Sequence, residues 1–175
     1  MTDLSGKHGL IVGVANKRSI SWAIAQAAAA AGARLALTYP TARLEENVRD
    51  LAATLENPVV AACDVSSDEQ IAALAETLDR EFGGLDFFVH GAAFAPQAEL
   101  SNPFVQTSRE GFRIALEVSA YSLVALTRVC APLMERRGGG SILTLTSNPD
   151  RTSPDLIARR TKNSAIDSLQ SCHKC

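Results

Sequence analysis

Short apolar runs alternate with segments of helical periodicity along the first 146 residues of this 175-residue chain. The runs occupy residues 10–12, 33–39, 59–65, 85–90 and 141–146; the segments of helical spacing occupy residues 19–31, 44–55, 67–82 and 108–134. The runs show no polar alternation, which is typical of parallel strands buried on both faces and joined by helical crossovers. The pattern therefore predicts an α/β fold with a doubly wound parallel sheet of the Rossmann-like type.

Glycine, proline and serine stand where these predicted elements begin or end. Gly32 and Gly83 follow the last apolar positions of two helices, where a left-handed residue commonly ends a helix. Pro40 ends the second strand, because proline cannot donate a ladder hydrogen bond. Ser67, with Gln70 three residues later, is a capping signal for the third helix. After the fourth strand, a loop is expected as far as residue 108.

Length and composition favour one domain of a cytoplasmic protein. A chain with 46% apolar residues can bury a sizeable core, and its 17 basic and 19 acidic residues are well mixed. The first residues lack the regions of a signal peptide, and no run approaches the roughly 20 apolar residues of a membrane span. We expect small-molecule or protein partners, and neither nucleic acid nor a membrane.

The four cysteines fit a reducing compartment. Cys63 and Cys130 fall in apolar segments and are expected to be small buried hydrophobes. Cys172 and Cys175 are half of a metal-site pattern, but a structural zinc needs four ligands and no second pair lies nearby. We therefore expect no metal site.

The loop of residues 13–20 is the first candidate for a binding site. It joins a strand to an alanine-rich helix, whose N-terminus offers unpaired amides and the positive end of its dipole to a pyrophosphate. Gly13 lets the backbone approach a ligand, and Ser19 can either cap the helix or donate its hydroxyl to phosphate. A plain strand-to-helix turn has the same composition, so the loop alone does not decide.

Other strand ends support a ligand site at this loop. The carboxyl ends of parallel strands meet at one edge of the sheet, where doubly wound folds bind their ligands. The segments expected at this edge are Gly13, Tyr39, Asp64-Val65 and Gly91-Ala92. Their convergence predicts a dinucleotide site.

A set of motifs spread over residues 1–146 matches a known family. They are Ser5-Gly6-Lys7, Gly13-x5-Ser19-Ile20, Ala25-Gln26, Thr38-Tyr39, Cys63-Asp64-Val65, Phe88-Val89-His90, Phe94-Ala95-Pro96, Arg109-Glu110-Gly111-Phe112, Tyr121-Ser122 and residues 141–146. Together they resemble the NADH-dependent enoyl-acyl carrier protein reductases, which are divergent short-chain dehydrogenase/reductases. The resemblance implies a homotetrameric enzyme of fatty-acid elongation that reduces a trans-2-enoyl thioester, linked to acyl carrier protein or coenzyme A, with NADH.

The resemblance also assigns contacts to single residues. It implies pyrophosphate contacts at Gly13, Ser19 and Ile20, adenine contacts at Asp64 and Val65, nicotinamide-ribose neighbours at Gly91 and Ala92, and acyl-substrate contact at Ala95. The Asp64 carboxylate can accept from the adenine amino group, with a helix cap as the alternative. Gly91 and Ala92 are small enough for a cofactor to lie against them, with a tight strand-end turn as the alternative.

Position 40 departs from the family pattern. Pro40 replaces a residue able to hydrogen-bond adenosine, which leaves the cofactor preference less defined. No basic pair follows Tyr39 to bind a 2′-phosphate, and Arg43 alone gives little support for NADPH.

The catalytic part of the family pattern is missing after Thr146. The family continues with a tyrosine and then a Tyr-x6-Lys pair, whose phenol stabilises the enolate oxygen and whose lysine binds the nicotinamide ribose. Ser147 stands in place of the first tyrosine, and residues 147–175 contain none. Lys162 has Ala158 where a partner tyrosine would stand, and a solvated helix lysine is its alternative reading. No catalytic residue is therefore assigned.

The expected organisation is a dinucleotide-binding domain over residues 1–147 and a divergent tail over residues 148–175. The strand at 141–146 should be an uncovered edge, as in a truncated product, a frameshifted reading or a domain that takes its edge from a partner. Residues 108–134 are expected to form a homo-oligomer interface. Two hypotheses remain: an enoyl reductase impaired by the lost Tyr/Lys pair, or a non-catalytic nucleotide-binding or oligomer-partner protein.

Overall fold

The computed structural model describes residues 3–146, which form a five-stranded parallel sheet flanked by helices. The strands are β1 (His8–Val12), β2 (Arg34–Tyr39), β3 (Val59–Ala62), β4 (Phe87–His90) and β5 (Ser141–Thr144), in the spatial order β3-β2-β1-β4-β5. Every neighbouring pair is parallel. The predicted Rossmann-like sheet is confirmed, although β3, β4 and β5 are shorter than the apolar runs that predicted them.

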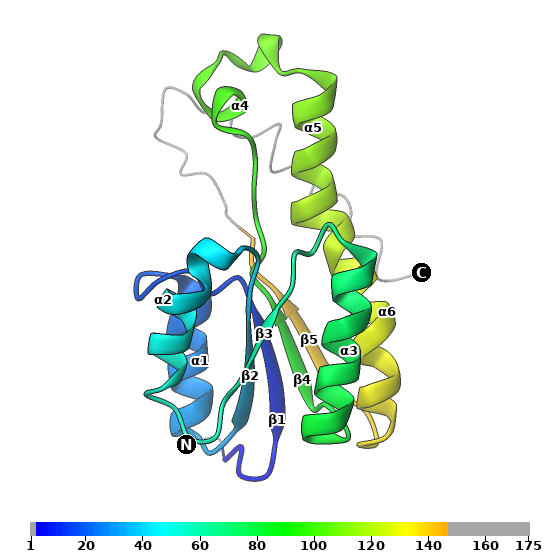
Figure 1. Cartoon of the computed structure of the whole chain (residues 1–175). Helices are drawn as coiled ribbons and strands as arrows, with labels where there is room; N and C mark the ends of the chain where they lie inside the picture. The colour runs from blue at the N-terminus through cyan, green and yellow to red at the C-terminus, as the bar shows by residue number, and fades with distance from the viewer. Residues whose placement is uncertain (1–2, 147–175) are drawn as a thin grey trace.

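Helices cover both faces of this sheet (Figure 1). Helices α1 (Ile20–Ala30) and α2 (Ala42–Ala52) lie on one face, and α3 (Asp68–Phe82) and α6 (Ser122–Glu135) lie on the other. Successive strand residues point to opposite faces, so Leu10 and Val12 join the core under α3 and α6 while Ile11 joins the core under α1 and α2. This two-sided burial explains why β1 is apolar throughout.

The predicted boundary of α3 is confirmed in detail. The Ser67 hydroxyl accepts a hydrogen bond from the Gln70 amide at 3.3 Å and caps the helix. Gly83 ends the helix in the left-handed conformation, with φ of 65°. Helix α3 therefore begins and ends where its sequence signals stand.

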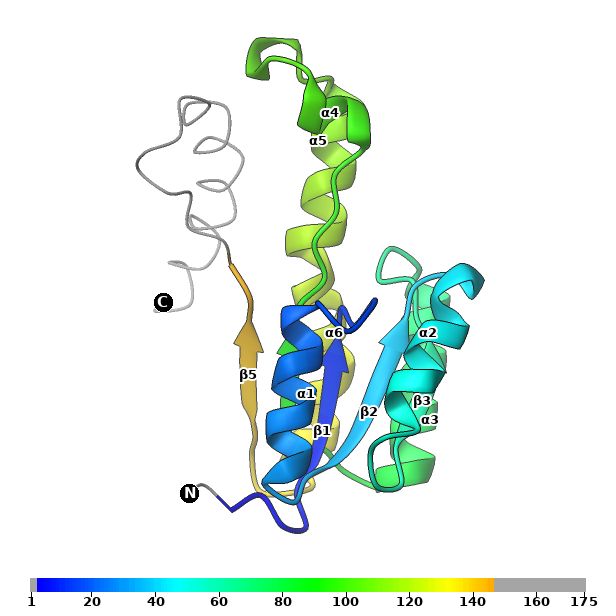
Figure 2. The same cartoon turned by 90° about the vertical axis from the view of Figure 1, so that its left-hand side faces the viewer.

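The segment between β4 and β5 is more structured than expected. The predicted loop contains two short helices, α4 (Gln97–Ser101) and the 3₁₀ helix η1 (Phe104–Gln106). The predicted long helix is present as α5 (Arg109–Leu116), the π-helix η2 (Glu117–Tyr121) and α6. In Figures 1 and 2, α4 and α5 project beyond the sheet. Glu99 joins them, because its carboxylate accepts from the Ser108 amide at 3.0 Å and from the Ser108 hydroxyl at 2.6 Å.

One expectation about membrane spans needs correction. The helix spanning residues 109–135 is long and apolar enough, by length and composition alone, to cross a membrane. The sequence analysis missed it because Arg113, Glu117 and Arg128 interrupt the apolar run within the helix. The buried side of α6, with Leu126, Cys130 and Leu133, packs into the sheet core, as in the core helix of a globular domain.

Strand β5 is the edge of the sheet within the described residues. It pairs with β4 alone, and its Ile142 and Leu143 side chains are exposed. The expected uncovered edge is thus present in residues 3–146.

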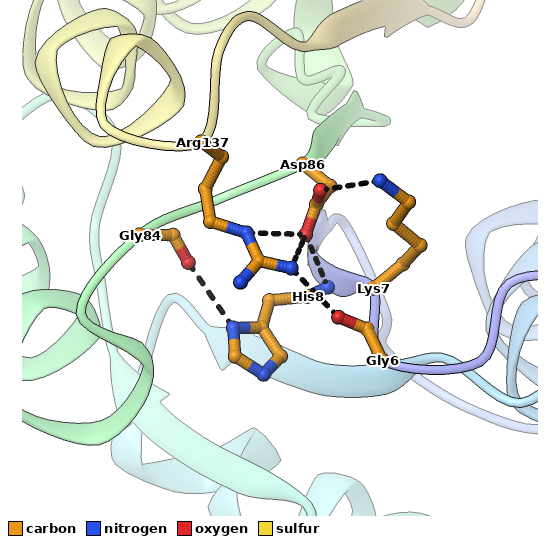
Figure 3. Close-up of polar contacts among 6 residues, drawn as sticks. All are labelled: Gly6, Lys7, His8, Gly84, Asp86 and Arg137. Carbon is orange, nitrogen blue, oxygen red and sulfur yellow. Dashed lines mark hydrogen bonds and ion pairs between the residues drawn. The ribbon is translucent and has the colours of Figure 1, made fainter.

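A polar cluster at the amino-terminal ends of β1 and β4 links three segments of the chain (Figure 3). The Asp86 carboxylate accepts from Lys7 Nζ at 3.0 Å, from the His8 amide at 2.9 Å and from Arg137 Nε at 3.2 Å. Arg137 also donates to the Gly6 carbonyl at 2.7 Å. Burial alone would raise the pKa of Asp86, but these three donors outweigh it and hold the pKa below its ordinary value. The cluster fastens β1, β4 and the α6–β5 turn far from the candidate binding edge.

Replacing Asp86 with alanine should lower the free energy of unfolding by about 1–3 kcal/mol, the usual cost of hydrogen bonds to a mostly buried charge. Asp79→Ala is the matched control, because its ion pair with Arg136 is exposed on both sides and should contribute about 0–1 kcal/mol. Urea unfolding of the two variants measures the difference. Equal losses would show that Asp86 is no structural anchor.

Candidate functional site

The carboxyl ends of the strands lie at one edge of the sheet, as predicted. Val12 is in register with His90 and Tyr39 with Ala62, and Ile11 pairs with Leu37, so β1, β2, β3 and β4 end within about one residue of the same level. In Figure 2 the arrowheads of β1, β2 and β5 point toward the end from which α5 projects. The residues that follow these strands therefore surround one site.

Gly13 and Gly91 form the floor of this site by packing against each other. Gly13 has φ of +93°, and a Cβ built on it would lie 2.3 Å from the Gly91 carbonyl oxygen. A Cβ on Gly91 would lie 2.1 Å from the Ser21 hydroxyl and 2.8 Å from the Val12 carbonyl oxygen. That carbonyl accepts from both the Gly91 amide and the Ser21 hydroxyl, each at 3.1 Å. Both glycines are therefore required by the contact between the β1 and β4 loops.

Ser19 organises the first loop. It occupies the N-cap position of α1, but its side chain makes no capping bond; its oxygen instead accepts from the Ala15 and Asn16 amides, each at 3.1 Å. These bonds use oxygen lone pairs and leave the hydroxyl proton for another acceptor. Of the two roles considered for Ser19, side-chain capping of α1 is the one that the structure does not contain.

The start of α1 presents amide donors. Within residues 3–146 the backbone amides of Ile20 and Ser21 donate to no backbone carbonyl, while those of Trp22 and Ala23 donate to Ser19. The Ile20 side chain is exposed and leaves the helix end uncovered. Unpaired amides at a helix N-terminus suit an anion such as a pyrophosphate.

Asp64 and Val65 follow β3 at the same edge. One Asp64 carboxylate oxygen, Oδ1, accepts from the Ser66 amide at 2.9 Å and the Ser66 hydroxyl at 2.7 Å. The other oxygen has no hydrogen-bond partner in the described part of the chain. Because Ser67 caps α3, the helix-cap alternative for Asp64 is excluded. The Val65 side chain is buried in the core, and its amide makes no backbone hydrogen bond among residues 3–146.

β2 and α2 border the side of the edge at which the resemblance implies adenosine contacts. The Tyr39 ring is buried, with the Arg49 guanidinium 6.0 Å from its centroid. Pro40 and Arg43 are exposed. No hydrogen bond or ion pair within residues 3–146 involves the Arg43 side chain, so the structure adds nothing to its case as a phosphate ligand.

The loop after β4 carries Ala92 and Ala95. Ala92 is partly buried against the core beneath α3 and α6, and Ala95 is half-buried beside the exposed Phe94. Pro96 then leads into α4. The structure thus brings Ala92 and Ala95 to the same edge as Gly13 and Gly91.

His90, at the end of β4, is a buried structural histidine. The Ser122 hydroxyl donates to the Val118 carbonyl at 2.7 Å, so His90 Nε2 must donate to Ser122, also at 2.7 Å. Nδ1 then accepts from the Thr144 hydroxyl at 3.2 Å. Burial lowers the pKa of His90 to about 4 and keeps the ring neutral.

Acid should therefore destabilise the fold through His90. The unfolded histidine, with a pKa near 6.5, takes up a proton at higher pH than the folded one, so this contribution to stability is present above pH 6.5 and lost toward pH 4. The loss attributable to His90 is about 3 kcal/mol. His90→Gln, which cannot titrate, should show a correspondingly shallower pH dependence in denaturant unfolding. Identical pH slopes would contradict the buried neutral state.

Three serines to which the sequence analysis gave no site role contact the β1 and β4 segments, although Ser122 belongs to the Tyr121-Ser122 motif. Ser21 in α1, Ser119 in η2 and Ser122 in α6 donate to or accept from backbone or side-chain groups of the β1 and β4 loops. The available signal was a hydroxyl on an otherwise apolar helix face, which commonly means a buried polar contact. Their partners lie up to 32 residues away in sequence, so the contacts themselves carry no local pattern.

Two of the four cysteines lie in the described part of the chain, and the C-terminal pair lies outside it. Cys63 and Cys130 are buried free thiols, as predicted, and burial raises the pKa of Cys63 to about 11 and that of Cys130 to about 12. Among residues 3–146 no His, Cys, Asp or Glu cluster has metal-binding geometry. The Cys172-His173-Lys174-Cys175 segment, Ser147 and Lys162 lie outside the described residues.

A scan against protein-family models matches residues 13–158 to the enoyl-(acyl carrier protein) reductase model. The chain belongs to the enoyl-(acyl carrier protein) reductase family. The matched span holds every residue assigned to the site, from Gly13 to Ala95. Family membership rests on most of the chain and not on the glycine loop alone.

Curated relatives and solved structures agree with this family. The enoyl-(acyl carrier protein) reductases (NADH) of Aquifex aeolicus and Bacillus cereus are 49% and 47% identical, over 82% of this chain in each case. The chain spans just over half of these relatives, 53% and 56% of their lengths. The crystal structure of the Aquifex reductase superposes with a TM-score of 0.85 at 44% identity, covering 95% of this chain and 73% of that one. An Anaplasma phagocytophilum reductase solved in complex with NAD superposes with a TM-score of 0.86 at 34% identity, covering 99% of this chain and 68% of that one.

Proposed function

We propose that this chain is the cofactor-binding part of an NADH-dependent enoyl-(acyl carrier protein) reductase. It binds NADH at the sheet edge and receives an enoyl thioester, carried by acyl carrier protein or coenzyme A, beside Ala95. The observation that carries the proposal is the convergence of donors and small residues from β1, β3 and β4 on one edge. The reductases that match this chain are named for NADH, and one was solved with NAD.

Each part of the edge fits one part of the dinucleotide. The amides of Ile20 and Ser21 and the Ser19 hydroxyl suit the pyrophosphate, since all three are donors at a helix N-terminus. The second Asp64 oxygen and the Val65 amide suit the acceptor and donor pattern of adenine. Gly91 and Ala92, which directly follow β4 at the same edge, would lie beside the nicotinamide ribose. The cofactor would supply a hydride when bound. The residues described here would bind and orient the cofactor.

Calorimetric titration of NADH tests this assignment. Asp64→Ala should weaken binding about tenfold, in line with the loss of one charge-assisted hydrogen bond. Asp50→Ala, which removes the same charge from an exposed position of α2, should leave the affinity unchanged. Equal affinity in both variants would move the adenine elsewhere, and no heat with the wild-type chain would refute the proposal. NADPH should bind more weakly than NADH, because no basic pair follows Tyr39.

A specific observation keeps the second hypothesis in view. The chain has two tyrosines, Tyr39 and Tyr121, and neither stands where the family pattern places its catalytic phenols. Tyr39 is buried in the core under α1 and α2, and Tyr121 is half-exposed in η2. A chain that binds NADH without turning over an enoyl thioester would be a non-catalytic nucleotide-binding protein or an oligomer partner. Its free thiols and mixed charge fit a cytoplasmic location in either case.

We also propose that η2 and the helices on either side of it form a homotetramer interface. Phe112, Tyr121 and Val124 are 44%, 50% and 49% exposed on this apolar helical segment, and such patches commonly mark association sites. Val124→Arg should therefore lower the molar mass measured by light scattering. Val105→Arg, at an 89% exposed position of η1 outside the segment, is the control. A wild-type chain that is monomeric at high concentration would contradict the proposal.

A further inference from the structure

The loop between β4 and α4 makes few hydrogen bonds of its own. At one end the Gly91 amide donates to Val12, and at the other the Pro96 carbonyl accepts from the Glu99 amide. Within residues 3–146 the backbones of Ala92, Ala93 and Ala95 make no hydrogen bond. A loop of this kind needs an anchor from elsewhere to keep one conformation.

Ser119 supplies that anchor from the π-helix η2. Its hydroxyl oxygen accepts from the Phe94 amide at 3.0 Å, and the same hydroxyl donates to the Phe94 carbonyl at 3.2 Å. One side chain therefore satisfies both backbone groups of the residue next to Ala95. The contact spans 25 residues of sequence and fixes the middle of the loop to a helix.

A second serine of the same helical segment holds the beginning of the loop. Ser122, three residues after Ser119, accepts from His90, and His90 directly precedes Gly91. The Ser122 amide donates to the Glu117 carbonyl, five residues back, where an α-helix would use Val118. The Val118 carbonyl instead accepts a hydrogen bond from the Ser122 hydroxyl. Ser119 in this π-helical turn and Ser122 directly after it therefore both contact the segment around the end of β4. π-Turns inside α-helices are frequent at functional sites.

We propose that Ser119 is a positioning residue that holds the loop of Gly91, Ala92 and Ala95 ready for the nicotinamide and acyl ends of the ligands. The proposal rests on the proposed function of this edge, and it adds a residue that touches neither ligand. Because the loop is already fixed before the ligand binds, binding does not have to supply the free energy needed to order it. Without Ser119 only a fraction of molecules present the loop correctly, and the apparent affinity falls by that fraction.

Hydrogen exchange of the unliganded chain tests the anchor itself. Ser119→Ala should speed deuterium uptake by the peptide that contains the Phe94 amide about tenfold, because that amide loses its acceptor. Ser119→Thr, which keeps the hydroxyl, should exchange like the wild type. Ser101→Ala is the control, since Ser101 accepts from Gln97 on the exposed side of α4 and does not touch the loop. Unchanged exchange in Ser119→Ala, or equal acceleration in Ser119→Thr, would overturn the proposal.

NADH titration of the same variants tests the positioning role. Ser119→Ala should raise the Kd about three- to tenfold with an unchanged melting temperature, and Ser119→Thr should restore the wild-type Kd. Faster exchange with an unchanged Kd would make Ser119 merely structural and contradict the proposal. A wild-type chain that binds no NADH would refute the proposed function, and the exchange comparison would still judge whether Ser119 holds the loop.

Discussion

A polypeptide of this sequence should reduce enoyl thioesters at least about 10²–10³ times more slowly than a full-length member of the family, even with NADH bound. Hydride addition to the β-carbon builds negative charge on the thioester oxygen, and removing one positioned donor typically has a cost of this size. Tyr39 is buried in the core, Tyr121 lies in η2, and Ser147 stands where the family has a tyrosine. His90, whose pKa is lowered to about 4, is neutral at pH 7 and already engaged with Ser122 and Thr144.

An assay that follows NADH consumption with an enoyl thioester decides this point. The same sample should bind NADH in a parallel titration, which separates a lost catalyst from a misfolded protein. Turnover comparable to a full-length reductase would contradict the expectation and place a catalytic donor within residues 147–175. Turnover below this range, with intact binding, would favour the non-catalytic hypothesis.

Gly13→Ala should both destabilise the fold and abolish high-affinity NADH binding. The new Cβ would lie 2.3 Å from the Gly91 carbonyl oxygen, so the β1 and β4 loops must separate, and the backbone at φ of +93° adds strain. We expect a loss of roughly 2–5 kcal/mol in the free energy of unfolding and at least about a tenfold rise in the Kd for NADH. Denaturant unfolding and calorimetry measure the two effects.

Gly138→Ala is the matched control for this substitution. Gly138 also has a positive φ, of +83°, but a Cβ built there meets nothing within 4 Å, so it isolates the strain alone. It should lower stability by about 1–2 kcal/mol and leave NADH binding unchanged. Equal effects of the two substitutions would show that the contact between Gly13 and Gly91 has no special importance.

The strands and their burial on both faces of the sheet were predictable, because two-sided burial imposes a continuous apolar pattern. Leu10, Ile11 and Val12 show this directly, since they enter the two cores in turn. Helix α3 was equally predictable, because Ser67 and Gly83 are local signals for local hydrogen bonds. These features depend on residues close together in the sequence.

The contacts that Gly13, Gly91 and Ser19 make were less predictable than their place at the carboxyl edge of the sheet. Gly13 and Gly91 were singled out for room near a ligand, yet the space beside each is taken by the other loop or by Ser21. Ser19 was given two roles, and its bonds to Ala15 and Asn16 belong to neither. Contacts between loops depend on the tertiary fold, so a local sequence pattern cannot reveal them.

Helices α4 and η1 and the π-turn escaped prediction for a different reason. A helix of five or three residues is too short to show periodicity, and no side chain caps the N-terminus of α4 or of η1. The π-turn shifts the helical phase by one residue, which periodicity over residues 108–134 averages away. The Ser119 hydroxyl contacts a residue 25 positions away in the sequence, so this anchor became visible only in three dimensions.

Mapping of backbone amides by nuclear magnetic resonance during a titration with NADH tests the central claim most directly. The claim is that residues of β1, β3 and β4 hold one dinucleotide at the carboxyl edge of the sheet. It predicts saturable shifts that are largest at the amides of Ile20, Val65 and Ala92 and negligible around Asp86 at the opposite end. No shifts in a folded sample, or shifts concentrated around Asp86 and Arg137, would contradict it.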